Sequence, residues 1–235
     1  MLPLAILAGG YATRLGALSS KIPKCLIEIN GRPFVDWQLE LLTKNGYSEF
    51  VFCVSYKSDL IQEYLGNGSD RGISIEYSSD GPTQLGTGGA IQKALPRLGD
   101  KFGVIYGDSY LRTSYSALEK NFLSSKSLAL MAVYKNQNQF DSSNVEFVNG
   151  KLVNYEKGNN NRNMRYIDYG VTFFRDVAFR PWRNQSSFDL SEVCHQLAKE
   201  RQLDGYEVFE RFYEIGSIQG IVELSQYLRR VPNEL

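Results

Sequence analysis

The chain opens with a short apolar run that leads almost directly into a pair of glycines. Residues 4–7 are four consecutive apolar residues, a pattern typical of a buried parallel strand. Gly9 and Gly10 follow, with only Ala8 in between. Because glycine has no Cβ, the backbone can turn there and approach a ligand closely. Successive backbone N–H groups in such a turn attract anions. The segment therefore predicts an α/β fold with an anion-binding loop after its first strand.

Cationic side chains follow this glycine pair. Thr13 and Arg14 come within a few residues, and Lys24 stands directly after Pro23, whose ring restricts the backbone and can orient the lysine. The spacing is neither the G-x-G-x-x-G of dinucleotide-binding enzymes nor the Gly-Lys-Ser/Thr ending of a P-loop. The segment thus favours a triphosphate cradle and weakens a nicotinamide or ATPase interpretation.

Apolar runs and helical patterns alternate through the first half of the chain. Strands are predicted at 50–54, 73–77 and 102–106, and helices at 33–44, 59–65 and 87–95. Such alternation predicts a mostly parallel twisted sheet with helices on both faces, in a Rossmann-like arrangement. A chain of 235 residues is long enough for one such domain, and we expect a single domain over residues 1–235.

The second half has a different pattern. Strands are predicted at 128–133, 145–148, 152–155 and 206–212, and helices at 188–200 and 217–228. Asn149-Gly150 separates two of these strands, and Asn-Gly is a strong signal for a tight β-hairpin. We therefore expect a small β-hairpin region attached to the main sheet.

Composition limits the function classes. Lysine plus arginine and aspartate plus glutamate both number 26, so no overall charge favours nucleic acid or an anionic membrane as a partner. No long apolar stretch and no basic, apolar leader are present, which predicts a soluble cytoplasmic protein. Cys25, Cys53 and Cys194 are an odd number without metal-type spacing, and His195 is the single histidine, so neither disulfides nor zinc are expected. Cys194 and His195 are neighbours in a predicted helix and point to different faces, which argues against a catalytic pair.

Six segments together resemble a known family. The opening LAGGYATRLG with IPKCLIEINGRPFVDW is similar to the start of sugar-1-phosphate nucleotidyltransferases, also called nucleotide-sugar pyrophosphorylases. Further segments resemble that family in the same order along the chain: QLGTGGAI at 84–91, YGDSYL at 106–111, NYEKG at 154–158, DYGVTFF at 168–174 and YEIGSIQG at 213–220. Among its branches, the chain looks most like the short bacterial enzymes that activate mannose or heptose 1-phosphates.

The resemblance implies a nucleotidyltransferase fold and a reaction. A nucleoside triphosphate and a sugar 1-phosphate would be the substrates, Mg²⁺ the cofactor, and a nucleoside diphosphate sugar and pyrophosphate the products. Guanylyl transfer for a surface glycan such as lipopolysaccharide or capsule is favoured, with uridylyl, thymidylyl or cytidylyl transfer as alternatives. Residues 1–110 would form the nucleotide-binding half, and residues 111–235 the sugar-phosphate-binding half with the carboxy-terminal helices.

The resemblance also assigns roles to residues. Arg14, Lys24 and Asp108 would be catalytic, with Arg14 on the β and γ phosphates and Lys24 between the α-phosphate and the incoming phosphate. The nucleotide would be bound by Leu7, Ala8, Gly9, Gly10, Thr13, Arg14, Gln84, Gly86, Thr87 and Gly88. The sugar phosphate would be bound by Tyr106, Glu156, Lys157, Asp168 and Gly170.

One position departs from the family pattern. Asp108 and Glu214 would hold Mg²⁺, but the family usually has aspartate where this chain has Glu214. Glutamate is one methylene longer and can still bind Mg²⁺ directly or through water, because that ion keeps several waters. Glu214 also keeps open a different class of function, a non-catalytic homologue that binds a sugar nucleotide and regulates a partner. The hairpin and the carboxy-terminal helices are candidates for a homodimer interface.

Overall fold

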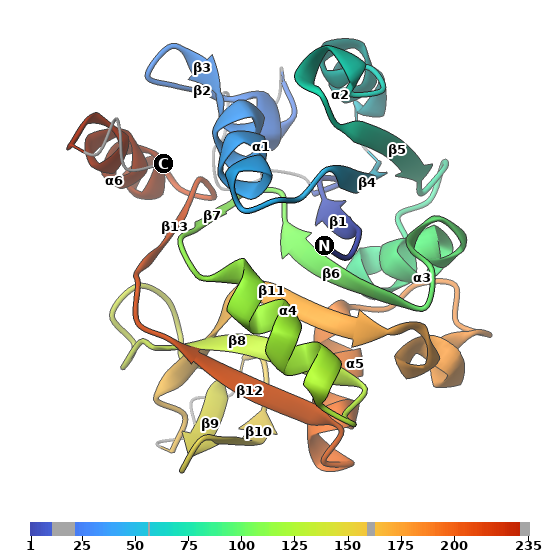
Figure 1. Cartoon of the computed structure of the whole chain (residues 1–235), viewed down its shortest axis with the longest axis vertical. Coiled ribbons are helices and arrows are strands. Elements are labelled where there is room, and N and C mark those ends of the chain that lie inside the picture. Colours follow the sequence, from blue (N-terminus) through green and yellow to red (C-terminus); the bar gives the residue numbers. More distant parts are fainter. Residues whose placement is uncertain (11–21, 56, 159–162, 231–235) are drawn as a thin grey trace.

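The computed structural model describes residues 1–10, 22–55, 57–158 and 163–230 (Figure 1). The strands are β1 (Leu4–Leu7), β2 (Glu28–Ile29), β3 (Arg32–Pro33), β4 (Glu49–Val54), β5 (Ser74–Ser79), β6 (Lys101–Tyr106), β7 (Ser109–Leu111), β8 (Ala129–Lys135), β9 (Val145–Val148), β10 (Lys151–Tyr155), β11 (Tyr166–Arg175), β12 (Leu203–Val208) and β13 (Phe212–Glu214). The helices are η2 (Lys24–Leu26), α1 (Phe34–Lys44), α2 (Ser58–Leu65), η3 (Ser69–Arg71), α3 (Gly86–Leu98), α4 (Tyr115–Ser124), η4 (Asp176–Trp182), α5 (Leu190–Lys199) and α6 (Ile218–Arg230).

Half of the main sheet is parallel. β1 lies between β4 and β6, and β5 extends the sheet beyond β4, with every pair parallel. Leu7 is level with Cys53 of β4 and with Tyr106 of β6, so the three strands end at the same edge. The α/β fold predicted from the alternating pattern is therefore confirmed. Ligands in such sheets collect at this carboxyl edge.

The other half makes the sheet mixed. β11 pairs antiparallel with β6 and with β8, and β12 lies parallel to β8. β9 and β10 form the predicted hairpin, with Asn149 at φ 52° and Gly150 at φ 74°. Two successive left-handed residues are what a type I′ turn requires. The hairpin prediction from Asn-Gly is thus confirmed.

Helices cover both faces of the sheet (Figure 1). Leu4 and Ile6 of β1 belong to the buried cluster that includes residues of α1, α2 and α4, whereas Ala5 belongs to the cluster that includes α3 and α5. Side chains alternate between faces along a strand, so a strand buried on both sides is apolar throughout. The uninterrupted apolar run of β1 follows from its central position. None of the helices described is long and apolar enough to cross a membrane.

The sequence pattern is incomplete in the second half. It does not predict α4 or β11, and it places one strand at 206–212 where β12 ends at Val208 and β13 begins at Phe212. The break has a structural reason, because β12 pairs with β8 in the main sheet whereas β13 pairs with β7 in a separate two-stranded sheet. The chain therefore leaves one sheet and joins another between these residues.

Candidate active site

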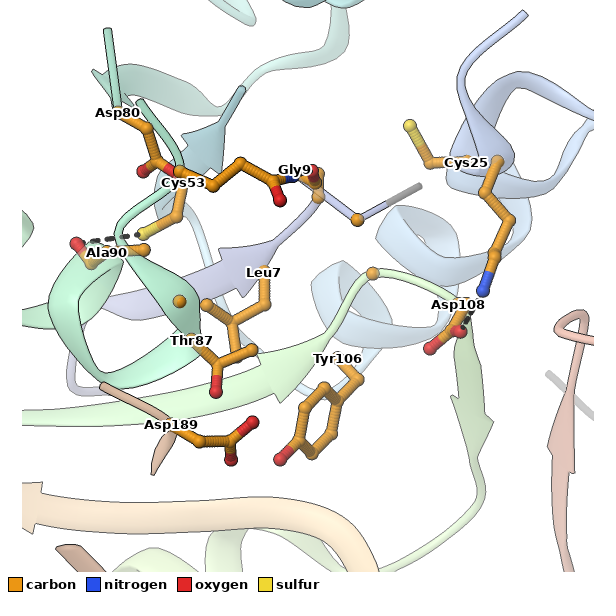
Figure 2. A pocket seen from close by; sticks show the side chains of 16 residues that line it. Leu7, Gly9, Cys25, Cys53, Asp80, Thr87, Ala90, Tyr106, Asp108 and Asp189 are labelled. Atoms are coloured by element: carbon orange, nitrogen blue, oxygen red, sulfur yellow. Dashed lines mark hydrogen bonds and ion pairs between the residues drawn. The ribbon is translucent and has the colours of Figure 1, made fainter. Parts of the chain in front are cut away.

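A cavity of about 400 Å³ lies at the carboxyl edge of β1, β4, β5 and β6 (Figure 2). Its walls come from the last residues of β1, β4 and β6, from the loops that follow β1, β5 and β6, and from η2, α3 and the start of α5. The lining residues are Leu7, Ala8, Gly9, Gly10, Lys24, Cys25, Cys53, Asp80, Gln84, Gly86, Thr87, Ala90, Tyr106, Gly107, Asp108 and Asp189. We call it the nucleotide cavity.

The predicted glycine loop forms part of its wall. The Ala8 N–H donates to the Cys53 carbonyl at 2.9 Å, and the Gly107 N–H donates to the Leu7 carbonyl at 3.0 Å. A Cβ on Gly107 would lie 2.8 Å from the Leu7 carbonyl oxygen, so only glycine fits there. These bonds hold the end of β1 against β4 and β6. Thr13 and Arg14 lie outside the described residues.

Lys24 and Asp108 meet beside this loop. Lys24 Nζ lies 2.8 Å from Asp108 Oδ2, as the dashed line at Asp108 in Figure 2 marks. Lys24 begins the short helix η2 after Pro23, and Asp108 follows Gly107 at the end of β6. Both side chains are only about a quarter exposed, which favours a stable pairing over a solvated one. Two predicted catalytic residues are thus adjacent.

The glycine segment predicted to bind the base, residues 84–89, packs against Phe188, just before α5. Gln84 Nε2 lies 3.5 Å from the Gly9 carbonyl oxygen, and Gly86 and Thr87 line the cavity. The Gly88 N–H donates to the Phe188 carbonyl at 3.0 Å, so Gly88 faces Phe188 instead of the cavity. A Cβ on Gly86 or Gly88 would lie 2.4 Å from Phe188 atoms. Close packing therefore explains part of this glycine run.

A second cavity of about 510 Å³ adjoins the first and shares Tyr106 and Asp108 with it. Its walls come from β10, β11, β13, α6 and residues 139–144. The other lining residues are Ser109, Gln139, Phe140, Asp141, Asn144, Tyr155, Lys157, Ile167, Asp168, Tyr169, Gly170, Arg211, Phe212, Tyr213, Glu214, Ser217, Gln219, Gly220 and Glu223. We call it the acceptor cavity.

Asp168 has the most perturbed carboxylate in the acceptor cavity. Burial raises its pKa to about 6, although the Gly170 N–H and the charge of Lys157 act in the opposite direction. The Gly170 N–H donates to Asp168 Oδ1 at 2.9 Å, and Gly170 has φ 105°, a conformation that favours glycine. β11 carries a bulge between Asp168 and Thr172, which changes how its residues face the cavity.

Of the two neighbouring residues predicted to bind the sugar phosphate, Lys157 lines a cavity and Glu156 does not. Lys157 lines the acceptor cavity, with Nζ 3.7 Å from Asp189 Oδ2. Glu156 does not line either cavity. Asp189 caps α5 by accepting from the Ser191 N–H at 2.8 Å, and it also lines the nucleotide cavity. Lys157 and Asp189 therefore connect the two cavities.

Cys53, Asp80 and Asp189 are among the residues of the nucleotide cavity that were not predicted from the sequence. Cys53 is the second-last residue of β4 and Asp80 directly follows β5, so the carboxyl-edge rule could have indicated both. Burial raises the pKa of Cys53 to about 12, so the thiol is protonated and acts as an apolar wall. Asp189 carries a helix-capping signal, D-x-x-E. Nothing in the local sequence indicates that it lies beside Thr87, which is distant from it in the chain.

The two predicted metal ligands line one cavity. Glu214 pairs with Ser109 in the β13–β7 ladder, and the Ile215 N–H donates to the Asp108 carbonyl at 2.9 Å. Glu214 Oε2 accepts from the Gly216 N–H at 2.7 Å. Within the described ranges, no group of three or more histidine, cysteine, aspartate and glutamate side chains could hold a metal. Two carboxylates beside a phosphate site suit Mg²⁺, which takes few carboxylates and keeps its waters.

This geometry suits transfer of a phosphorus group. One cavity has a glycine loop at a strand end, a second is lined by carboxylate, amide and cationic side chains, and a lysine with a carboxylate stands where they meet. His195, the single histidine, does not line either cavity, and its Nδ1 lies 2.6 Å from the carbonyl oxygen of Tyr155, behind the lining of the acceptor cavity. Positioning and charge neutralisation suffice for such a transfer, without a protein nucleophile. The fold and the site thus fit an enzyme class that transfers a phosphorus-containing group between two substrates.

Comparison with known proteins gives the family. The model of the nucleotidyl transferase family matches residues 4–230. The chain is 30% identical over 213 residues to D-glycero-alpha-D-manno-heptose 1-phosphate guanylyltransferase of Campylobacter jejuni, covering 90% of this chain and 93% of that protein. It is 35% identical over 113 residues to N-acetylmuramate alpha-1-phosphate uridylyltransferase of Neisseria meningitidis, covering 48% and 49%. A crystal structure of a putative glucose-1-phosphate thymidylyltransferase from Bacillus anthracis superposes with a TM-score of 0.86 at 17% identity, covering 99% of this chain and 97% of that one.

The chain therefore belongs to the nucleotidyl transferase family. Within that family it is a sugar-1-phosphate nucleotidyltransferase, and a nucleotide and a sugar 1-phosphate are consistent with the family as substrates.

Proposed function

We propose that the chain transfers a guanylyl group from GTP to a heptose- or mannose-type 1-phosphate, for surface glycan synthesis. The observation that carries the proposal is the near full-length similarity to the Campylobacter heptose 1-phosphate guanylyltransferase. A protein of the same description from Aneurinibacillus thermoaerophilus is 33% identical over 129 residues, which cover 54% of this chain and 55% of that protein.

In the proposed reaction, a phosphate oxygen of the sugar 1-phosphate attacks the α-phosphorus of GTP. The new bond joins that oxygen to the α-phosphorus, the bond from the α-phosphorus to the β-bridging oxygen breaks, and pyrophosphate leaves. Lys24 stands at the junction of the two cavities, where its charge can offset the charge that develops on the transferring phosphate. Lys157 is one of the cationic residues that line the acceptor cavity and lies next to Asp189, and we assign it to the sugar phosphate.

Asp108 and Glu214 are the residues that would hold Mg²⁺. When bound, the ion would neutralise phosphate charge and orient the triphosphate. Asp108 pairs with Lys24, and Glu214 accepts from the Gly216 N–H and from the Ser217 hydroxyl at 3.2 Å. Each carboxylate therefore already has a fixed orientation in the acceptor cavity.

The proposal is tested by screening GTP, UTP, CTP and dTTP against a panel of sugar 1-phosphates, with pyrophosphate release as the readout. GTP with heptose 1-phosphate or mannose 1-phosphate should give the highest kcat/KM. A preference for UTP would instead support the activity named for the Neisseria relative. Turnover with none of the pairs, together with binding of a finished nucleoside diphosphate sugar, would support a regulatory homologue.

A further inference from the structure

The acceptor cavity extends past the residues assigned to the sugar phosphate. Lys157, Asp168 and Gly170 line it together with a second group of polar and aromatic side chains from residues 139–141, from Arg211 just before β13, and from β13 and α6. This second group consists of Gln139, Phe140, Asp141, Arg211, Tyr213, Gln219 and Glu223. We call it the distal wall. The roles given above leave the distal wall without a function.

Arg211 is held in a fixed position in this wall. Its guanidinium carbon lies 4.0 Å from the ring centre of Phe140 and 4.8 Å from that of Tyr213. One Nη2–H donates to the Glu223 carboxylate. Stacking on aromatic rings orients the planar guanidinium, so its other donors also have fixed directions.

Donor capacity remains on this guanidinium. An arginine has five N–H donors, and within the described part of the chain the buried Nε of Arg211 has no hydrogen-bond partner. An unpaired buried donor is costly unless water or a ligand satisfies it. The side chain as a whole is about one third exposed, so other donors of the head group can be reached from the cavity.

Glu223 supplies the complementary acceptor. Gln219 Nε2 donates to Oε1 at 2.7 Å, and Arg211 donates to Oε2. Hydrogen bonds from Gln219 and Arg211 hold the pKa of Glu223 below its usual value, so it is a carboxylate at neutral pH. Each oxygen of a carboxylate can accept more than one hydrogen bond.

We propose that Arg211 and Glu223 bind hydroxyl groups on the carbons outside the ring of the acceptor sugar and set the specificity of the enzyme for that sugar. A hydroxyl both donates and accepts, so a donor beside an acceptor matches neighbouring hydroxyls on adjacent carbons. A second anionic group on the sugar fits less well, because Glu223 offsets the charge of Arg211 and Asp141 adds another carboxylate to the wall. The substrate class is thus a sugar 1-phosphate whose only charged group is the phosphate and whose sugar carries hydroxyls on carbons outside the ring. This inference rests on the proposed function.

A graded set of acceptors tests the inference. The 1-phosphates of 6-deoxymannose, mannose and D-glycero-D-manno-heptose carry no, one and two hydroxyls on the carbons outside the ring. Glucuronic acid 1-phosphate carries a carboxylate at that place. With GTP, kcat/KM of the parent should rise about tenfold along the neutral series and be lowest for the carboxylate. In Arg211→Met and Glu223→Gln the rise should fall to less than about threefold. Arg211→Lys keeps the charge but loses the planar fork, and should fall between the parent and Arg211→Met.

The ratios of kcat/KM between acceptors are not affected when part of a variant is misfolded. A ratio of kcat/KM values within one variant does not depend on the fraction of active enzyme. Arg32→Met is the matched control, because Arg32 also lies over an aromatic ring, 4.4 Å from the centre of Trp37, and pairs with Glu40 outside both cavities. Its ratios should equal those of the parent.

Two results would overturn the inference while leaving the proposed function intact. One is a parent that uses sugar 1-phosphates but shows no rise along the neutral series. The other is a set of variants that lower kcat/KM for all acceptors by one common factor, which is what a purely structural ion pair predicts. A parent inactive with every acceptor would instead contradict the proposed function.

Discussion

Lys24 Nζ lies 2.8 Å from Asp108 Oδ2, at the boundary between the nucleotide and acceptor cavities. Asp108 lines both cavities, and Lys24 lines the nucleotide cavity. Two substrates bound in adjoining cavities would bring their phosphates together at this pair. If the proposed function is correct, we expect the bond to the α-phosphorus to form and break beside this ion pair.

Replacing Lys24 by alanine should lower kcat at least roughly a hundredfold, because it removes a charge that stabilises the transferring phosphate. The unfolding free energy should change by less than about 1 kcal/mol, since the ion pair is partly exposed. Steady-state kinetics and chemical denaturation check both. Lys44→Ala removes a lysine that pairs with Glu40 at 3.0 Å outside both cavities, and it should keep parent activity. Near-normal kcat in Lys24→Ala would remove the lysine from the catalytic site.

Arg14→Ala should have an effect on turnover similar to that of Lys24→Ala. This prediction rests on the sequence alone, because Arg14 lies outside the described residues. A raised KM for the triphosphate with unchanged kcat would limit Arg14 to substrate binding.

A divalent cation should be required. Excess chelator should stop pyrophosphate release, and added Mg²⁺ should restore it. Asp108→Asn should need a higher Mg²⁺ concentration for half-maximal activity, because one anionic ligand is lost. Asp36→Asn, at an aspartate that lies 3.6 Å from Arg71 outside both cavities, is the control. Full activity in excess chelator would contradict the metal assignment.

Glu214→Asp should remain active with a changed metal preference, whereas Glu214→Gln should lose most activity. Aspartate keeps the carboxylate and shortens its reach by about 1.5 Å, which a Mg²⁺ site that holds waters can absorb. Glutamine can still accept from the Gly216 N–H, so its loss of activity would report the missing charge and not a broken turn. A Mg²⁺ titration of both variants makes the measurement. If the parent is active and the glutamine variant equals it, Glu214 is not a metal ligand.

Asp168 should make stability depend on pH. Burial raises its pKa from 3.8 to about 6, so the native state binds this proton more tightly than the unfolded state. Its contribution to stability is therefore largest at low pH and is lost as pH rises through about 6. Asp168→Asn removes this titration and can keep the bond from Gly170. The unfolding free energy of the variant minus that of the parent should be about 1 kcal/mol larger at pH 7.5 than at pH 5.0. Equal differences at both pH values in urea denaturation would show that Asp168 titrates normally.

Local patterns predicted the parallel half of the fold well. The run at 4–7, the glycine turn and the Asn149-Gly150 hairpin each depend on short-range chemistry, namely burial on both faces, freedom of φ and a type I′ turn. The break between Val208 and Phe212 could not be predicted in this way, because it depends on pairing with β8 and β7, which are distant in sequence.

The candidate site was predictable only in part for the same reason. Residues at strand ends, such as Gly9 and Asp108, follow from the carboxyl-edge rule. The role of Gly88 in packing against Phe188 is a contact between residues 100 apart, and the Lys157–Asp189 contact joins a hairpin end to a helix cap. Such contacts leave no periodic signal in the sequence.

The most direct test of direct transfer between the two cavities is exchange of labelled pyrophosphate into GTP. If the phosphate of the sugar attacks GTP itself, exchange requires the sugar 1-phosphate, because pyrophosphate leaves only when both substrates are present. We predict label in GTP when enzyme, Mg²⁺, GTP, labelled pyrophosphate and heptose or mannose 1-phosphate are combined, and none when the sugar 1-phosphate is omitted. Rapid exchange without any sugar 1-phosphate would reveal a nucleotidyl group held on the protein and would contradict direct transfer.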